Sequence, residues 1–137
     1  MRMRGDFDGG GREVYDLDGI LGPPVRQFVE RHVRSLLTWD ILVFFHKNPH
    51  THLEPVALAA RLGRRLDEVH AEIDALCSHD ILHCDGELVR YDPPHTTRET
   101  IGSFVDACQD RGRRLALIAL VLHRITPATA TREQEEQ

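Results

Sequence analysis

Histidine and cysteine side chains crowd one stretch of the sequence, and both are ligands that zinc and copper prefer. The crowded residues are His70, Cys77, His79, His83, Cys84 and His95. Their spacing matches no standard zinc pattern, because there is no C-x-x-C pair and neighbours on a strand, such as His83 and Cys84, point to opposite faces. We therefore expect no metal and no other cofactor. If the protein were a metal-responsive regulator, His70, Cys77 and His79 would be the first candidate ligands.

Motifs of catalysis are missing from the sequence. It has no nucleophile elbow, no H-E-x-x-H and no glycine-rich phosphate loop between a predicted strand and a predicted helix. Gly9, Gly10 and Gly11 follow one another, but no strand is predicted before them and no helix directly after them. The sequence therefore predicts a protein that is not an enzyme.

Charged side chains between residues 49 and 92 give two conflicting indications. Arg61, Arg64 and Arg65 cluster at a predicted turn and could, together with Arg90, hold DNA phosphates. The same arginines could instead pair with Asp67 and Glu68. The segment holds four arginines against nine carboxylates, a net charge of −5, whereas a surface that binds DNA is usually basic. Glu68, Glu72 and Asp74 could therefore form an acidic face that docks a basic protein partner.

The N-terminal part of the chain divides at a pair of prolines. Residues 1–22 hold six glycines among acidic residues and few apolar ones, which predicts a flexible tail. Pro23 and Pro24 can open a helix, and apolar residues at helical spacing predict one long helix or two abutting helices over residues 23–48. Trp39 lies among these apolar residues and is predicted to be part of the core.

The segment 49–92 carries clear local signals. Pro55 opens a predicted helix that Gly63 ends, and a second helix is predicted over Asp67–His79. Apolar runs at 81–84 and 87–91 flank Asp85-Gly86, which is a strong signal for a two-residue hairpin loop. Two short helices joined by a tight turn and followed by a hairpin are typical of a winged helix-turn-helix domain.

A final helix is predicted within residues 93–126, followed by a polar tail over 127–137. Apolar residues fall on the a and d positions of a heptad repeat. They are Ile101, Phe104, Cys108, Leu115, Ile118, Leu122 and Ile125. Because this apolar stripe exceeds what one small domain can cover, it is predicted to form a homodimer interface.

Over residues 24–125 this order of elements, with the stretches Val56–Gly63 and Ile81–Gly86, resembles the winged-helix bacterial regulators of the MarR and ArsR kind. The resemblance implies a mainly α fold with a small β-wing and long N- and C-terminal helices. It also implies a dimeric transcriptional regulator that places its second motif helix, Asp67–His79, in the major groove. The alternative is a winged-helix protein-interaction module that does not bind DNA.

Composition is consistent with a globular protein of one domain. The chain has 137 residues, of which 41% are hydrophobic and 28% are charged. No apolar run approaches the length of a membrane span, and the first residues lack the apolar stretch of a signal peptide, so we expect a cytoplasmic protein without membrane contact. Three cysteines, an odd number, predict free thiols.

Overall fold

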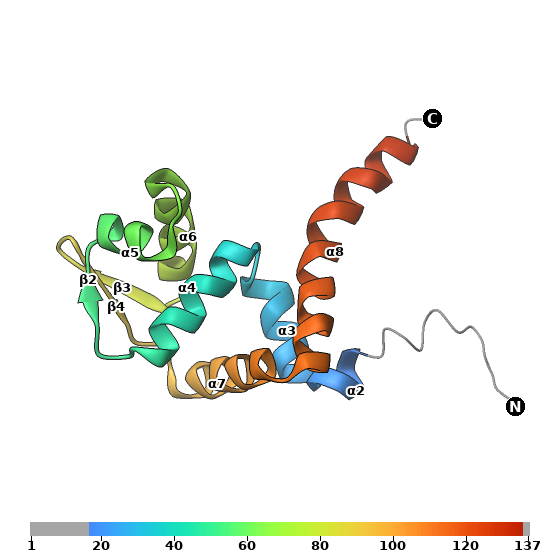
Figure 1. Cartoon of the computed structure of the whole chain (residues 1–137), viewed down its shortest axis with the longest axis horizontal. Helices are drawn as coiled ribbons and strands as arrows, with labels where there is room; N and C mark the ends of the chain where they lie inside the picture. Colours follow the sequence, from blue (N-terminus) through green and yellow to red (C-terminus); the bar gives the residue numbers. More distant parts are fainter. Residues whose placement is uncertain (1–16, 136–137) are drawn as a thin grey trace, which may run out of the picture.

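The computed structural model describes the backbone of residues 17–135 and the side chains of residues 19–123 (Figure 1). The chain is mainly helical with a small antiparallel sheet, which confirms the predicted class. In chain order the elements are α2 (Leu17–Leu21), α3 (Pro23–His32), α4 (Leu36–Lys47), β2 (His52–Leu53), α5 (Pro55–Leu62), α6 (Leu66–Ser78), β3 (Leu82–Asp85), β4 (Leu88–Tyr91), α7 (His95–Gln109) and α8 (Arg111–Glu135).

One end of the molecule consists of the sheet with α5 and α6 (Figure 1). The strands lie in the order β2-β4-β3, and both pairings are antiparallel. Leu82, Val89 and Tyr91 are buried. Because Leu82 pairs with Tyr91 and Cys84 pairs with Val89, Cys84 lies on the same inner face of the sheet.

Helices α5 and α6 both end in a Schellman motif, in which a residue in the left-handed conformation lets two backbone N–H groups bond back to the last turn. After α5 this residue is Gly63, with φ 66°. After α6 it is Asp80, with φ 61°. The N–H of Ile81 then donates to the carbonyl of Leu76 at 3.0 Å, which turns the chain sharply into β3.

The other end of the molecule is a helical layer in which α2 and α3 pack against α7 and α8 (Figure 1). Helix α4 lies between the two ends and contacts α6, α7 and β4. Trp39 of α4 meets Phe104 of α7 edge to face, with ring centroids 5.4 Å apart. Phe45 of α4 stacks on Tyr91 of β4 at 6.3 Å. One core therefore runs through both ends, and Trp39 belongs to it as predicted.

The N-terminal elements differ from the prediction in their bounds. The chain is already helical at Leu17, and Leu21 is buried, so the last residues of the predicted tail 1–22 pack on the fold. Residues 1–16 lie outside the described residues. Of the two alternatives for residues 23–48, two helices are correct. The Ser35 side chain accepts a hydrogen bond from the N–H of Thr38 and starts α4 as a new helix.

The predicted single C-terminal helix is broken at Asp110. This residue leaves the helical conformation, and its carboxylate accepts a hydrogen bond from the N–H of Arg113 at 2.9 Å, so it caps a new helix. Helix α8 continues to Glu135, through most of the predicted polar tail 127–137. The predicted heptad residues therefore lie on two helices, with Ile101, Phe104 and Cys108 on α7 and the later ones on α8.

The loop of the hairpin is one residue later than predicted. Asp85 is paired with Leu88, so the two loop residues are Gly86 and Glu87 instead of Asp85 and Gly86. Gly86 has φ 68°, and Glu87 is not among the residues with positive φ. Glycine at the first loop position is the requirement of a type II′ turn, whereas Asp-Gly favours a type I′ turn with two positive φ angles.

Candidate functional site

Three of the four arginines predicted to contact DNA lie together where α5 turns into α6, and each has a partner within the chain. Arg65 pairs with Asp67 at 2.8 Å. Arg64 lies 3.7 Å from Asp40 and 4.0 Å from Glu68. The Arg61 guanidinium lies over the ring of Phe44, 5.5 Å from its centroid. The alternative pairing with Asp67 and Glu68 is therefore present for Arg65 and Arg64, whereas Arg61 contacts Phe44 instead.

Arg90 lies on β4 and belongs to a separate set of contacts. Its guanidinium donates to Asp85 at 2.6 Å and to Asp92 at 2.9 Å. Hydrogen bonds to Asp92 and Asp85 raise the pKa of Arg90 above its ordinary value. Asp85 and Arg90 thus neutralise each other on the outer face of the hairpin.

The three carboxylates predicted to form a docking face on α6 do not share one face. Glu68 and Asp74 are exposed. Glu72 is buried: it accepts a hydrogen bond from the Thr38 hydroxyl at 2.7 Å and pairs with Arg34 at 3.1 Å. Glu72 faces inward because it lies on the same helix face as Val69 and Leu76, which are in the core. The prediction of Glu72 as a docking residue is therefore wrong, and its side chain links α6 to α4.

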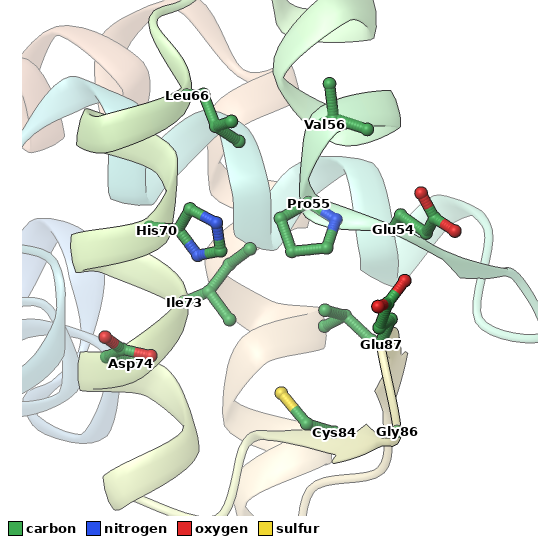
Figure 2. A pocket seen from close by; sticks show the side chains of 11 residues that line it. Glu54, Pro55, Val56, Leu66, His70, Ile73, Asp74, Cys84, Gly86 and Glu87 are labelled. Atoms are coloured by element: carbon green, nitrogen blue, oxygen red, sulfur yellow. The ribbon is translucent and has the colours of Figure 1, made fainter.

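A groove with a volume of about 420 Å³ lies between the first turn of α5, one face of α6 and the hairpin (Figure 2). We call it the acidic groove. Its lining residues are Glu54, Pro55, Val56, Leu66, His70, Ile73, Asp74, Cys84, Gly86, Glu87 and Val89. Its inner wall is apolar, and Val56 and Leu66 keep 55% and 40% of their surface exposed.

The charge of the acidic groove has one sign. Glu54, Asp74 and Glu87 contribute carboxylates, and no arginine or lysine lines the groove. Asp74 lines the α6 side, whereas Glu54 and Glu87 line the opposite side (Figure 2). All three are exposed, and within the described part of the chain none of them has an ion pair or a side-chain hydrogen bond. The groove can therefore accept a cationic group with an apolar neighbour.

Sequence reasoning found only part of this groove. Asp74 was predicted as a docking residue, but Glu54 and Glu87 were not, because Glu54 lies 20 positions before Asp74 and Glu87 lies 13 positions after it, in the hairpin loop. A weak signal exists, since Glu54 directly precedes the proline that opens α5 and Glu87 lies in the hairpin loop. A residue that precedes a helix and a residue in a hairpin loop both usually keep their side chains at the protein surface.

The first candidate metal ligands are not brought together. His70 lines the acidic groove. His79 instead contacts His32 of α3, with 3.0 Å between their Nδ1 atoms, and Cys77 contacts Cys84, with 3.6 Å between sulfur atoms. Burial, His79 and Arg31 lower the pKa of His32 to about 4. Among the described residues, no group of three or more His, Cys, Asp or Glu side chains could hold a metal ion.

The residues predicted for dimerisation also separate into two sets. Ile101, Phe104 and Cys108 of α7 are buried within the chain, so they are not available to a partner. Leu115 and Leu122 of α8 are 58% and 45% exposed, and Ile118 is half-buried. The side chain of Ile125 lies outside the described residues. On α8 the core residues are Leu117, Leu120 and Val121 instead.

No helix in the described range 17–135 is both long enough and apolar enough to cross a membrane. Three surfaces are candidates for function: the acidic groove, the turn with Arg61, Arg64 and Arg65, and the exposed face of α8. Comparison with protein-family models, with curated proteins and with solved structures finds no match to this chain.

Proposed function

We propose that this chain is a regulatory protein whose residues 36–91 form a winged-helix domain that docks a basic segment of a protein partner in the acidic groove. The order of elements supports the domain type: helix α4, strand β2, helices α5 and α6, then the β3–β4 hairpin. The observation that carries the proposed activity is the gathering of three unpaired carboxylates over an apolar wall. An arginine or lysine side chain fits both parts, because its stem is apolar and its head is cationic.

Electrostatics favour a protein partner over DNA at this surface. The exposed groups of α6 and of the hairpin loop include Glu68, Asp74 and Glu87, which repel phosphates. Arg64, Arg65 and Arg90 are already paired with carboxylates. A basic partner would meet the opposite sign of charge, which speeds association and selects against acidic partners.

Binding of labelled peptides in solution tests this proposal. The probes are an arginine-leucine peptide, a glutamate-leucine peptide of the same length and a random duplex DNA, each titrated at low and moderate salt. We expect the protein to bind the arginine peptide, more weakly as salt rises, and to bind neither of the other two. Failure to bind any basic peptide would overturn the docking function.

Charge variants locate the binding surface. Neutralising the groove with Glu54→Gln, Asp74→Asn and Glu87→Gln should weaken binding of the arginine peptide at least tenfold, about 1.4 kcal/mol. The matched control is Glu30→Gln, Glu99→Gln and Asp106→Asn, which changes the net charge equally at positions outside the groove. This control should retain most of the wild-type affinity. Equal losses in both triple variants would show that only the net charge matters.

DNA-linked transcriptional regulation is the second candidate, and one observation favours it. Arg61, Arg64 and Arg65 are all exposed. The exposed ion pairs of Arg64 and Arg65 contribute only about 0–1 kcal/mol each, so phosphates could displace their carboxylates. In that case the duplex probe binds, and changing the three arginines to Ala abolishes its binding. The docking proposal predicts that the same triple variant binds the basic peptide as the wild type does.

The exposed apolar residues of α8 favour a homodimer as the working form. Leu115, Ile118 and Leu122 recur at helical spacing and lie on one face of the helix. We propose that a second copy of the chain covers this face, which is a smaller interface than the sequence predicted because α7 does not take part.

A further inference from the structure

Two cysteines from different elements meet between α6 and the hairpin. Cys77 lies in the last turn of α6, and Cys84 lies on the inner face of β3. Their sulfur atoms are 3.6 Å apart. Both are free thiols in the structure, as is Cys108, which is buried on α7. Cys108 is therefore an internal reference for a thiol that has no such neighbour.

We propose that Cys77 and Cys84 are a redox-active pair that a peroxide converts into an intramolecular disulfide, which joins α6 to β3. The sulfur atoms are close to van der Waals contact at 3.6 Å, and they must approach by about 1.5 Å to reach the S–S bond length of about 2.05 Å. The Schellman motif around Asp80 supports this pairing, because it fixes the turn that brings β3 back to the end of α6.

The chemistry needs one molecule of hydrogen peroxide. The Cys84 thiolate attacks one peroxide oxygen, the O–O bond breaks, hydroxide leaves, and Cys84 becomes a sulfenic acid. The sulfur of Cys77 then attacks the sulfur of Cys84, and the sulfenic hydroxyl leaves as water with the proton of the Cys77 thiol. In sum, two thiols are oxidised to a disulfide and one peroxide is reduced to two waters.

The order of these steps follows from the surroundings of the two sulfur atoms. Cys84 is exposed, whereas Cys77 is half-buried. Burial and a hydrogen bond to Cys84 raise the pKa of Cys77 to about 12. Cys77 is therefore poorly suited to react with peroxide in solution first. The charges of Cys84 and Asp74 contribute to the same rise in the pKa of Cys77.

The acidic groove gives this reaction a consequence, which rests on the proposed function. Cys84 lines the groove, opposite residues of α5 and beside Gly86 and Glu87 (Figure 2). A disulfide would draw β3 and its loop toward the end of α6 and would hold Glu87 relative to Asp74. We expect the oxidised groove to admit the basic peptide less readily.

Thiol counting by mass spectrometry tests the pair without any binding assay. The protein is exposed to hydrogen peroxide, unfolded without reductant, and labelled with N-ethylmaleimide. We expect the reduced protein to carry three labels, and the oxidised monomer to carry one label and to have lost two hydrogen atoms. Trypsin leaves both cysteines in the peptide 66–90, so digestion with a protease that cleaves before aspartate, at Asp80, separates the two linked halves.

Single variants decide between this pair and other oxidation products. Cys108→Ser should still form the disulfide and should carry no label after oxidation. Cys77→Ala and Cys84→Ala should each lose the intramolecular product, and either one that formed it through Cys108 would contradict the proposal. A wild type that keeps three labels, stops at sulfinic acid or links only between chains would also overturn it.

The two proposals fail separately. Titration of the arginine peptide into reduced and oxidised wild type should show several-fold weaker binding after oxidation, reversed by dithiothreitol and absent in Cys77→Ala, a position outside the groove lining. Unchanged affinity with a proven disulfide would remove the regulation and leave the redox pair. Absence of peptide binding in both forms would exclude the docking function. The number of N-ethylmaleimide labels would still show whether Cys77 and Cys84 form the disulfide.

Discussion

At the scale of single residues, Asp80 ends α6 in the left-handed backbone conformation, with φ 61°. A residue with a Cβ is strained there, although aspartate tolerates this conformation better than most residues do. Its carboxylate also lies at the negative end of the helix dipole, where a negative charge is unfavourable. Among the described residues, Asp80 is the non-glycine residue that has a positive φ.

Replacing Asp80 with Gly should stabilise the protein by about 0.5–1 kcal/mol, because relief of strain and of charge outweighs the extra entropy of glycine in the unfolded chain. The midpoint of urea denaturation measures this change. Gly63→Ala is the matched control: the same motif and φ 66° occur there, and a Cβ would meet no atom within 4 Å. It should destabilise by about 1 kcal/mol. Loss of stability in Asp80→Gly would contradict this account.

His32 gives the fold a pH dependence of defined sign. Its pKa is lowered from 6.5 to about 4, first by burial and then by the charges of His79 and Arg31. Between these values the unfolded chain binds a proton that the folded chain does not bind. Stability should therefore be full above pH 6.5, fall as the pH is lowered toward 4, and fall no further from this cause below that value.

The variant His32→Gln should flatten this dependence, measured as the free energy of unfolding at intervals from pH 7.5 to pH 5. A residual slope should remain, because burial also lowers the pKa of His46. The exposed His50 supplies the control, and His50→Gln should follow the wild-type curve. A wild type equally stable at both ends of this range would exclude a role for His32.

At the scale of elements, the contact between α4 and α6 depends on a buried polar pair. The Thr38 hydroxyl is fully buried and donates to Glu72, which Arg34 also contacts. This pair fixes the position of α6, which forms one wall of the acidic groove. A change at Glu72 should therefore act on stability first and on binding only through the position of α6.

Glu72→Ala should cost about 1–3 kcal/mol, because it removes the 2.7 Å acceptor of the Thr38 hydroxyl and leaves it only the Ser35 hydroxyl, 3.2 Å away. Thr38→Val removes that hydroxyl, so the double variant should lose less than the sum of the two single losses. Chemical denaturation of the four proteins measures this coupling. Glu68→Ala, on the exposed face of α6, should stay within about 0.5 kcal/mol of the wild type. Additive losses would show that the two side chains do not interact.

Elements with local signals could be predicted from the sequence, and those fixed by distant packing could not. Pro55 and Gly63 mark the ends of α5, and both were read correctly. The break at Asp110 was not predicted, because apolar residues continue at helical spacing on both sides of Asp110, which caps α8. Glu72 was placed on the wrong face of α6, although its spacing from Val69 and Leu76 predicts burial. Residues from three separate segments form the acidic groove, so the sequence indicated the sign of its charge but not which residues line it.

At the scale of the whole molecule, α8 extends away from the body that α2, α3 and α7 form around its first turns (Figure 1). Leu117, Leu120 and Val121 face this body and are buried, whereas Leu115 and Leu122 point elsewhere. Helix α8 thus carries an exposed apolar face beside the face that packs on the described part of the chain.

The proposed homodimer predicts that Leu115→Glu with Leu122→Glu yields a folded monomer, because the charges repel across the interface and leave the core of each chain intact. Light scattering at micromolar concentration measures the mass, and circular dichroism checks the fold. Leu36→Glu alters another exposed leucine, 42% exposed on α4, and should remain a dimer. A monomeric wild type would end this proposal.

The packing of α2 and α3 against α7 and α8 also sets the order in which the chain can fold as it is synthesised. Val25, Phe28 and Val29 leave the ribosome before α7 and α8, which cover this layer. Helices α5 and α6 and the hairpin contact near neighbours in sequence and can form before then. The apolar face of α3 therefore stays uncovered in the nascent chain until residues near Val121 emerge. A truncated chain that ends within α7 would expose this face and would be prone to aggregate.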